Sequence, residues 1–189
     1  MRLIGIMAVR SHDERNSVKF FRLALSMLLV LPCVAQQPQP AAPSKGVLSV
    51  AETQKLVPPA VFFQGQTATT QLRNSAAIRL DNGGLAIVAL VDTGGYSSAV
   101  RERYQFYLLT DASLQVGDKH LGPGAYGCGF LQDGVVVVMD LAGNDIFRTA
   151  IAKDADMTRP RPLQMQAGKS AGEFRLYLGR DYVTIKQSK

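Results

Sequence analysis

The sequence has few of the residues that cross-link small domains or bind metal ions. Its 189 residues include two cysteines, two histidines and no tryptophan. Cys33 and His12 lie within the first 35 residues, which we expect to be removed, so that Cys128 and His120 are left. A single thiol excludes an intramolecular disulfide, and one cysteine with one histidine lacks zinc-type spacing. We therefore expect no metal site and no cofactor.

No apolar run is long enough to span a bilayer, which requires about 20 residues. The run at 23–34 follows five basic residues and ends at Cys33-Val34-Ala35, with small residues at both positions that a signal peptidase reads. We expect residues 1–35 to be a signal peptide cleaved after Ala35, which leaves no stable membrane span in a periplasmic or secreted protein. The alternatives are an uncleaved N-terminal anchor, a lipoprotein lipidated at Cys33, and a translation start at Met7.

Charge of one sign is not concentrated along the chain. The formal net charge is +6, and half of this excess lies in the first 35 residues. The other basic residues form no stripe and are not interleaved with aromatic residues, as single-strand nucleic-acid binders require. We therefore expect no nucleic-acid partner, and the sequence leaves the oligomeric state open.

The chain is organised as a leader, a linker and one domain. Residues 36–45 (QQPQPAAPSK) contain three prolines and no apolar periodicity, which predicts an extended Pro/Gln-rich linker. No second linker of this kind and no internal repeat follow, so residues 46–189 are predicted to form a single β-rich domain. A domain of this size can bury about 70 per cent of its unfolded surface, so one core suffices without disulfides.

Short β-type runs separated by turn residues follow one another from residue 67 onward. They are expected as strands at 67–73, 77–80, 85–91, 104–110, 114–116, 125–131, 135–141, 147–151, 174–178 and 182–185. Tight reversals such as Asp133-Gly134 favour hairpins, and short helices are predicted after Ser49 and at 97–103. The sequence thus predicts an all-β, mainly antiparallel fold, a small β-barrel or β-sandwich with one or two short helices.

A glycine-rich strand and nearby aromatic residues point to ligand binding. Along residues 125–130, large side chains face one way and alanine and glycine the other, and so small a face admits a backbone, an aromatic ring or a ligand. Core packing is the alternative for the aromatic residues. We expect ligand contacts from Tyr96, Tyr104, Tyr126, Cys128 and Phe130. The valines at 135–138 lack alternation, which predicts a strand covered on both faces.

The segment Asp92-Thr93-Gly94 follows an apolar strand and resembles the active-site loop of retroviral-type aspartic peptidases. A second segment, 176–181, resembles the apolar-Gly-Arg-Asp segment of the same family. The resemblance implies a homodimer in which two Asp92 carboxylates share a proton and activate water. Gly95 and the bulky Tyr96 depart from the family pattern, and an ordinary strand end is the alternative.

Two further patterns are weaker indications of a catalytic site. Residues 168–172 fit Gly-x-Ser-x-Gly, the serine hydrolase elbow, but an alternating strand follows, so a hairpin loop is expected. Cys128 and His120 could form a thiol–base pair, although a free cysteine beside Tyr126 and Phe130 is more typical of a small buried hydrophobe. Neither pattern predicts an enzyme.

The segment 121–126, Leu-Gly-Pro-Gly-Ala-Tyr, resembles the hairpin end of uncharacterised secreted or periplasmic bacterial small β-domain families. That resemblance implies a small exported barrel or sandwich and brings no activity with it. The sequence therefore predicts an exported non-catalytic β-domain that binds a small molecule, a glycan or an envelope partner. The alternative function is the homodimeric aspartic peptidase that acts through Asp92.

Overall fold

The computed structural model describes residues 45–188. The predicted signal peptide at 1–35 and all but the last residue of the predicted linker therefore lie outside the described residues. Within residues 45–188, no helix is both long and apolar enough to cross a membrane.

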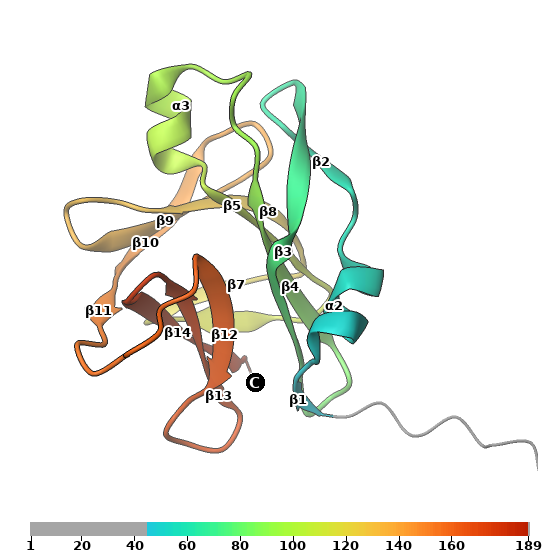
Figure 1. Ribbon diagram of the computed structural model, residues 1–189, viewed down its shortest axis with the longest axis vertical. Helices are drawn as coiled ribbons and strands as arrows, with labels where there is room; N and C mark the ends of the chain where they lie inside the picture. The colour runs from blue at the N-terminus through green and yellow to red at the C-terminus, as the bar shows by residue number, and fades with distance from the viewer. Residues whose placement is uncertain (1–44, 189) are drawn as a thin grey trace, which may run out of the picture. The chain divides into compact units, whose positions relative to one another are not determined.

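The first sheet contains eight strands, all paired antiparallel (Figure 1). Its order is β1 (Gly46–Val47), β3 (Gln66–Arg79), β4 (Leu85–Val91), β5 (Phe106–Thr110), β8 (Gly124–Phe130), β9 (Val135–Met139) and β10 (Asp145–Ala150). The short strand β2 (Ala60–Phe63) pairs with β3 beside this path. Consecutive strands are thus mostly neighbours, as tight reversals require.

The second sheet has six strands, again all paired antiparallel. Its order is β12 (Leu163–Ala167), β13 (Glu173–Leu178), β14 (Asp181–Gln187), β6 (Leu114–Val116) and β7 (Lys119–Leu121), and β11 (Ala152–Lys153) pairs with β14. The predicted hairpin loop at 168–172 joins β12 to β13, so that interpretation is confirmed.

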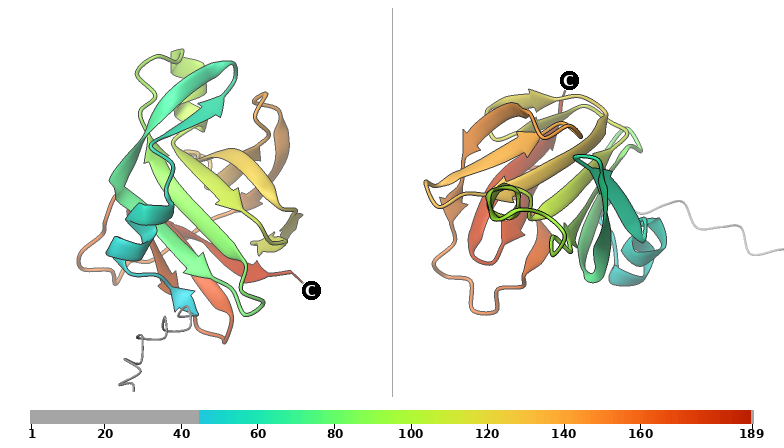
Figure 2. Two further views of the ribbon diagram at one scale, coloured as in Figure 1. Left: turned by 90° about the vertical axis from the view of Figure 1, so that its right-hand side faces the viewer. Right: turned by 90° about the horizontal axis from the view of Figure 1, so that it is seen from above.

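The two sheets pack against each other over the largest hydrophobic core (Figure 2). This core takes alternate residues from both sheets, such as Ile78 and Val88 from the first and Leu176 and Ile185 from the second. Such alternation buries one face of each strand, as period-two hydrophobicity requires. The predicted all-β antiparallel fold with short helices is confirmed, and residues 45–188 form two sheets without a closed barrel.

The opposite face of the first sheet carries two smaller cores. Phe63, Tyr96, Tyr104, Val137 and Met139 belong to one of them, beneath the β2–β3 hairpin. The other contains Leu48, Val57, Ala77, Ile87 and Ala89 and lies beneath helix α2 (Val50–Leu56). Strand β9 thus sends alternate side chains into cores on both faces, which confirms that its valine run is covered on both sides.

Both helices begin where the sequence predicts. The Ser49 hydroxyl and backbone exchange hydrogen bonds with Glu52, which forms the complete capping box of α2. Helix α3 (Ser98–Arg103) starts at Ser97, whose hydroxyl accepts a longer hydrogen bond, 3.4 Å, from the Val100 N–H.

The hairpin at Asp133-Gly134 is confirmed as the turn between β8 and β9, with Gly134 at φ 81°. The two strands expected at 67–73 and 77–80 are one long strand, β3, whose register shifts between Thr70 and Ser75. A β-bulge changes the facing of side chains without ending a strand, so the break in alternation was misinterpreted as a turn. Strands β1, β2, β7, β11 and β12 were not predicted, because they are short or rich in alanine, lysine or glutamine.

Candidate functional site

The five predicted ligand-binding residues do not converge on one site. Tyr96 and Tyr104 belong to the core beneath the β2–β3 hairpin, whereas Cys128 and Phe130 face the core between the two sheets. Tyr126 packs at the edge of the core between the two sheets, and its hydroxyl donates hydrogen bonds to the carbonyls of Gly122 and Pro123. The sheet itself separates the two groups, so these five residues do not line one common surface.

The small-residue face of β8 is filled by the chain itself. A methyl group added at Gly127 would overlap the ring of Phe63, and one added at Gly129 would overlap the carbonyl of Arg103. Because these two glycines lack side chains, the Phe63 ring and the end of α3 pack directly on β8 and leave no room for a ligand there. Of the three occupants that the sequence left open, the structure shows an aromatic ring at Gly127 and a backbone carbonyl at Gly129.

Tyr104 and Tyr96 are packing residues with different hydroxyl environments. Tyr104 is completely buried and stacks on Phe63 with ring centroids 4.0 Å apart. Burial raises the pKa of Tyr104, and its hydroxyl has no hydrogen-bond partner in the described chain. The Tyr96 hydroxyl donates to the carbonyls of Phe63 and Gln66 at 3.0 and 3.2 Å. Core packing, the alternative for these two residues, is what the structure shows.

Cys128 and His120 do not form a thiol–base pair. Cys128 is buried, and burial raises the pKa of its thiol far above its ordinary value, which disfavours a thiolate. His120 is exposed on β7, and its Nδ1 lies 2.9 Å from the Ser188 hydroxyl. Within residues 45–188, no three His, Cys, Asp or Glu side chains are grouped so as to hold a metal ion.

Asp92 lies in an exposed turn just after β4. Its carboxylate accepts a 3.0 Å hydrogen bond from the Gly94 N–H, the usual way for an aspartate to stabilise its own turn. The second peptidase-like segment continues beyond Gly179 into strand β14, where the family has a helix. The peptidase stays a hypothesis that rests on the motif, and no described contact of Asp92 favours it.

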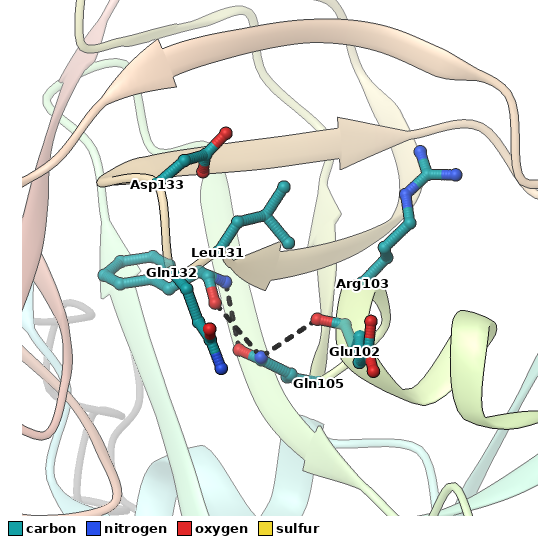
Figure 3. A pocket seen from close by; sticks show the side chains of 7 residues that line it. Glu102, Arg103, Gln105, Leu131, Gln132 and Asp133 are labelled. Atoms are coloured by element: carbon teal, nitrogen blue, oxygen red, sulfur yellow. Dashed lines mark hydrogen bonds between the residues drawn. The ribbon is translucent and has the colours of Figure 1, made fainter.

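A hollow of about 420 Å³ lies beside Phe130, between the end of α3 and the β8–β9 turn (Figure 3). Its lining consists of Glu102, Arg103, Gln105, Phe130, Leu131, Gln132 and Asp133. Phe130 is the one predicted ligand-binding residue in this lining. We regard this hollow as the candidate functional site because it combines apolar and polar groups in a concave surface.

Gln105 lines the hollow, and its side-chain amide is fixed by hydrogen bonds. Its Nε2 donates to the carbonyls of Glu102 and Phe130, and its Oε1 accepts from the Phe130 N–H at 2.9 Å. Gln105 directly precedes β5, and its amide thus connects the end of α3 to the end of β8 (Figure 3). With these hydrogen-bonding groups in use, Gln105 is a rigid wall of the site.

The charges at the rim are unevenly compensated. Arg103 pairs with Asp145, which also pairs with Arg148 at 2.8 Å. The carboxylates of Glu102 and Asp133, on either side of the hollow in Figure 3, have no hydrogen bond or ion pair in the described part of the chain. The hollow therefore combines two apolar lining residues, Phe130 and Leu131, with two carboxylates that have no partner in the described chain.

Sequence reasoning missed six lining residues as site residues: Glu102, Arg103, Gln105, Leu131, Gln132 and Asp133. The helix at 97–103 and the turn at Asp133-Gly134 were both predicted, but nothing local shows that they meet. The pairing of β5 with β8 brings them together, and that pairing joins residues far apart in the chain. No protein-family model, curated protein sequence or solved structure matches this chain.

Proposed function

We propose that this chain is an exported, non-catalytic domain that binds a small molecule in the hollow beside Phe130. The observation that carries the proposal is a concave lining that combines Phe130 and Leu131 with the carboxylates of Glu102 and Asp133, which have no partner within residues 45–188. Binding sites of small molecules are typically concave and apolar, with a few polar groups that fix orientation.

The charge of the rim favours a ligand with a positive group on an apolar body. Glu102 and Asp133 have no partner in the described chain, and Arg103 and Arg148 share the single carboxylate of Asp145, so these five side chains together carry one net negative charge. A cationic group beside either carboxylate gains charge-assisted hydrogen bonds, while an anion would be repelled. The apolar part of the ligand would cover Phe130 and Leu131.

Thermal unfolding with small apolar compounds of three charge classes tests this proposal. Apolar amines should raise the midpoint, because a ligand at 100 times its Kd stabilises the folded state by about 2.7 kcal/mol. Neutral and anionic analogues should give smaller shifts. The double variant Glu102→Gln/Asp133→Asn should abolish the preference for amines, and the control Asp81→Asn, an exposed carboxylate paired at 4.0 Å with Lys45, should retain it.

A second experiment uses a substitution that blocks the hollow instead of changing its charge. Gln132 is exposed in the turn at the rim, so Gln132→Trp should occlude the hollow without disturbing the core. The natural chain has no tryptophan, so the variant also has a single indole emission. If amines stabilise this variant as strongly as the natural protein, or if no compound class stabilises the natural protein, the proposed site is wrong.

We propose export on the basis of the leader alone. A cleaved signal peptide predicts a mature protein that begins at Gln36 in the periplasm or the medium. N-terminal sequencing of the protein from fractionated cells measures this directly. A protein recovered from the cytoplasm with an intact N-terminus would contradict the proposal.

A further inference from the structure

The turn between β3 and β4 contains the dipeptide Asn82-Gly83 (Figure 1). Both residues are exposed, and Gly83 has φ 87°, a left-handed conformation that glycine adopts without strain. A Cβ atom built on Gly83 would meet nothing within 4 Å, so the space beside this glycine is open in the described chain. Rearrangement of the dipeptide therefore does not require neighbouring side chains to move.

An asparagine followed by glycine is open to an intramolecular reaction, because no side chain on the glycine hinders its nitrogen. In this chain, a bond would form between Gly83 N and Asn82 Cγ, and the bond from Cγ to Nδ2 would break. The amide leaves as ammonia, which takes up the proton from Gly83 N. Water then opens the cyclic imide at either carbonyl, which yields aspartate or isoaspartate at position 82. The reaction therefore consumes only water and needs no oxidant or enzyme.

Hydrogen bonds act on both reacting groups of this turn. Gly84 N–H donates to Asn82 Oδ1 at 2.9 Å, and a donor at this oxygen stabilises the negative charge that develops there during the attack. Gly83 N–H donates to the Leu80 carbonyl at 3.0 Å, so this bond must open before the nitrogen reacts. Exposed turns open locally at a small fraction of the global free energy of unfolding. The turn thus activates the carbonyl, and local opening frees the nucleophile.

The leaving group distinguishes Asn82 from the two other asparagines in residues 45–188, Asn74 and Asn144. Neither of these precedes a glycine. Their Nδ2 atoms donate hydrogen bonds to Gln71 Oε1 at 2.8 Å and to Asp140 Oδ2 at 3.0 Å, respectively. Asn82 Nδ2 has no such bond in the described chain, where only its Oδ1 and backbone N–H are engaged. Its departure as ammonia therefore breaks no other interaction.

We propose that Asn82 is a site of spontaneous deamidation, and that the isoaspartyl product loosens the β3–β4 turn. In this product the main chain passes through the former side chain and gains one atom before position 83. The normal turn is closed by Leu80 N–H donating to the Gly84 carbonyl at 2.8 Å, and Asn82 N–H donates to Gln187 Oε1 on β14 at 3.3 Å. A longer main chain cannot keep all of these bonds. The aspartyl product keeps the normal backbone and an oxygen for Gly84 N–H.

Peptide mass spectrometry of the folded protein, incubated at pH 8 and sampled over time, tests the modification. Asn82 should convert at least about 10-fold faster than Asn74 or Asn144, because only its successor lacks a side chain. Asn144 is a matched control, since it is also exposed in a turn. Both aspartate and isoaspartate should appear at position 82. The inference is overturned if Asn82 stays intact or converts no faster than Asn144.

Hydrogen exchange of the separated isoaspartyl form tests the loosening of the turn. The amides of Leu80 and Gly83 should exchange about 2- to 10-fold faster than in fresh protein, the effect of losing about one hydrogen bond. The variant Asn82→Asp has the same added charge on a normal backbone and should exchange as fresh protein does. The Gly134 amide, in the β8–β9 turn, should be unchanged in all three proteins. Equal exchange at Leu80 and Gly83 in the isoaspartyl form and in Asn82→Asp would overturn the structural effect.

Discussion

At the scale of single residues, Tyr104 and Tyr96 show how similar side chains can contribute differently to stability. They lie in the same aromatic cluster, with ring centroids 5.5 Å apart in an edge-to-face arrangement. The Tyr96 hydroxyl has two carbonyl acceptors, whereas the Tyr104 hydroxyl is buried with none in the described chain. A buried polar group without a partner keeps its desolvation cost, so the two hydroxyls should have opposite effects.

We predict that Tyr104→Phe stabilises the domain by about 1 kcal/mol, because the substitution removes a buried hydroxyl and leaves the ring packing intact. The matched Tyr96→Phe should destabilise by about 1 kcal/mol, because it leaves two carbonyls without their donor. Urea unfolding followed by circular dichroism measures both changes. A loss of stability in Tyr104→Phe would indicate that a bound water or ligand satisfies that hydroxyl.

At Gly129, the backbone of β8 lies directly against the backbone carbonyl of Arg103 at the end of α3. We predict that Gly129→Ala costs about 2 kcal/mol or more, because the added methyl overlaps the backbone carbonyl of Arg103, and overpacking of this kind is relieved only by moving main chain. Gly122→Ala is the control, since a methyl there meets nothing within 4 Å. Equal urea midpoints for the two variants would show that α3 does not press on β8.

At the scale of elements, the two short helices differ in their caps. Helix α2 has a reciprocal capping box between Ser49 and Glu52, and α3 has only the single long hydrogen bond to Ser97. Short helices gain little from propensity, so caps and packing decide whether they form. Helix α2 also covers the core that contains Val57 and Ile87, so its loss would expose apolar surface.

We predict that Ser49→Ala destabilises the domain by about 1 kcal/mol, and Ser97→Ala by only a few tenths, because the first loses a hydroxyl that both accepts from the Glu52 N–H and donates to the Glu52 carboxylate. Chemical denaturation of the two variants gives the comparison. Hydrogen exchange of the α2 amides should accelerate in Ser49→Ala alone. The reverse order of the two losses would contradict the cap geometry.

Strands were predictable where apolar and polar residues alternate, and turns where turn-forming residues separate two such strands. The expected hairpin at Asp133-Gly134 and the strand at 85–91 are present because apolar alternation and a turn signal coincide there. Strand β12 was missed because Gln164 and Gln166 alternate with only two large apolar residues, Leu163 and Met165, after a proline-rich segment. A strand of this composition is stabilised by its neighbour β13 and has little preference of its own.

At the scale of the whole molecule, four hydrogen-bonded carboxylates stabilise a helix cap, a turn, a loop-to-strand contact and a pair of strands. Their pKa values are lowered, chiefly by hydrogen bonds from a neighbouring side chain. A lowered pKa in the folded state means that the ionised form contributes stability above the unfolded pKa, near 4, and that this contribution is lost as the pH falls through the folded value. The four are Glu52, Asp118, Asp140 and Glu173, with main partners Ser49, Thr149, Asn144 and Lys186, respectively.

We therefore predict that the free energy of unfolding is nearly constant from pH 7 to 5 and falls below about pH 4, where these carboxylates take up protons. Urea midpoints at pH 7, 5 and 3 measure this dependence. Asp140→Asn should make the acid decrease shallower, because it removes one carboxylate with a lowered pKa. Stability that rises between pH 5 and 3 would contradict the prediction.

Local sequence was sufficient for the all-β class, for both helix starts and for most turns, because alternation, caps and turn residues act within a few neighbouring positions. It also indicated that β8 allows close approach by a backbone, an aromatic ring or a ligand, since Gly127 and Gly129 leave its face open. Packing alone decided that Phe63 and Arg103 fill this face and that the hollow beside Phe130 forms where α3 meets the β8–β9 turn. Such contacts join residues far apart in the chain and depend on which sheet faces bury the most apolar surface together, a property that no short segment contains.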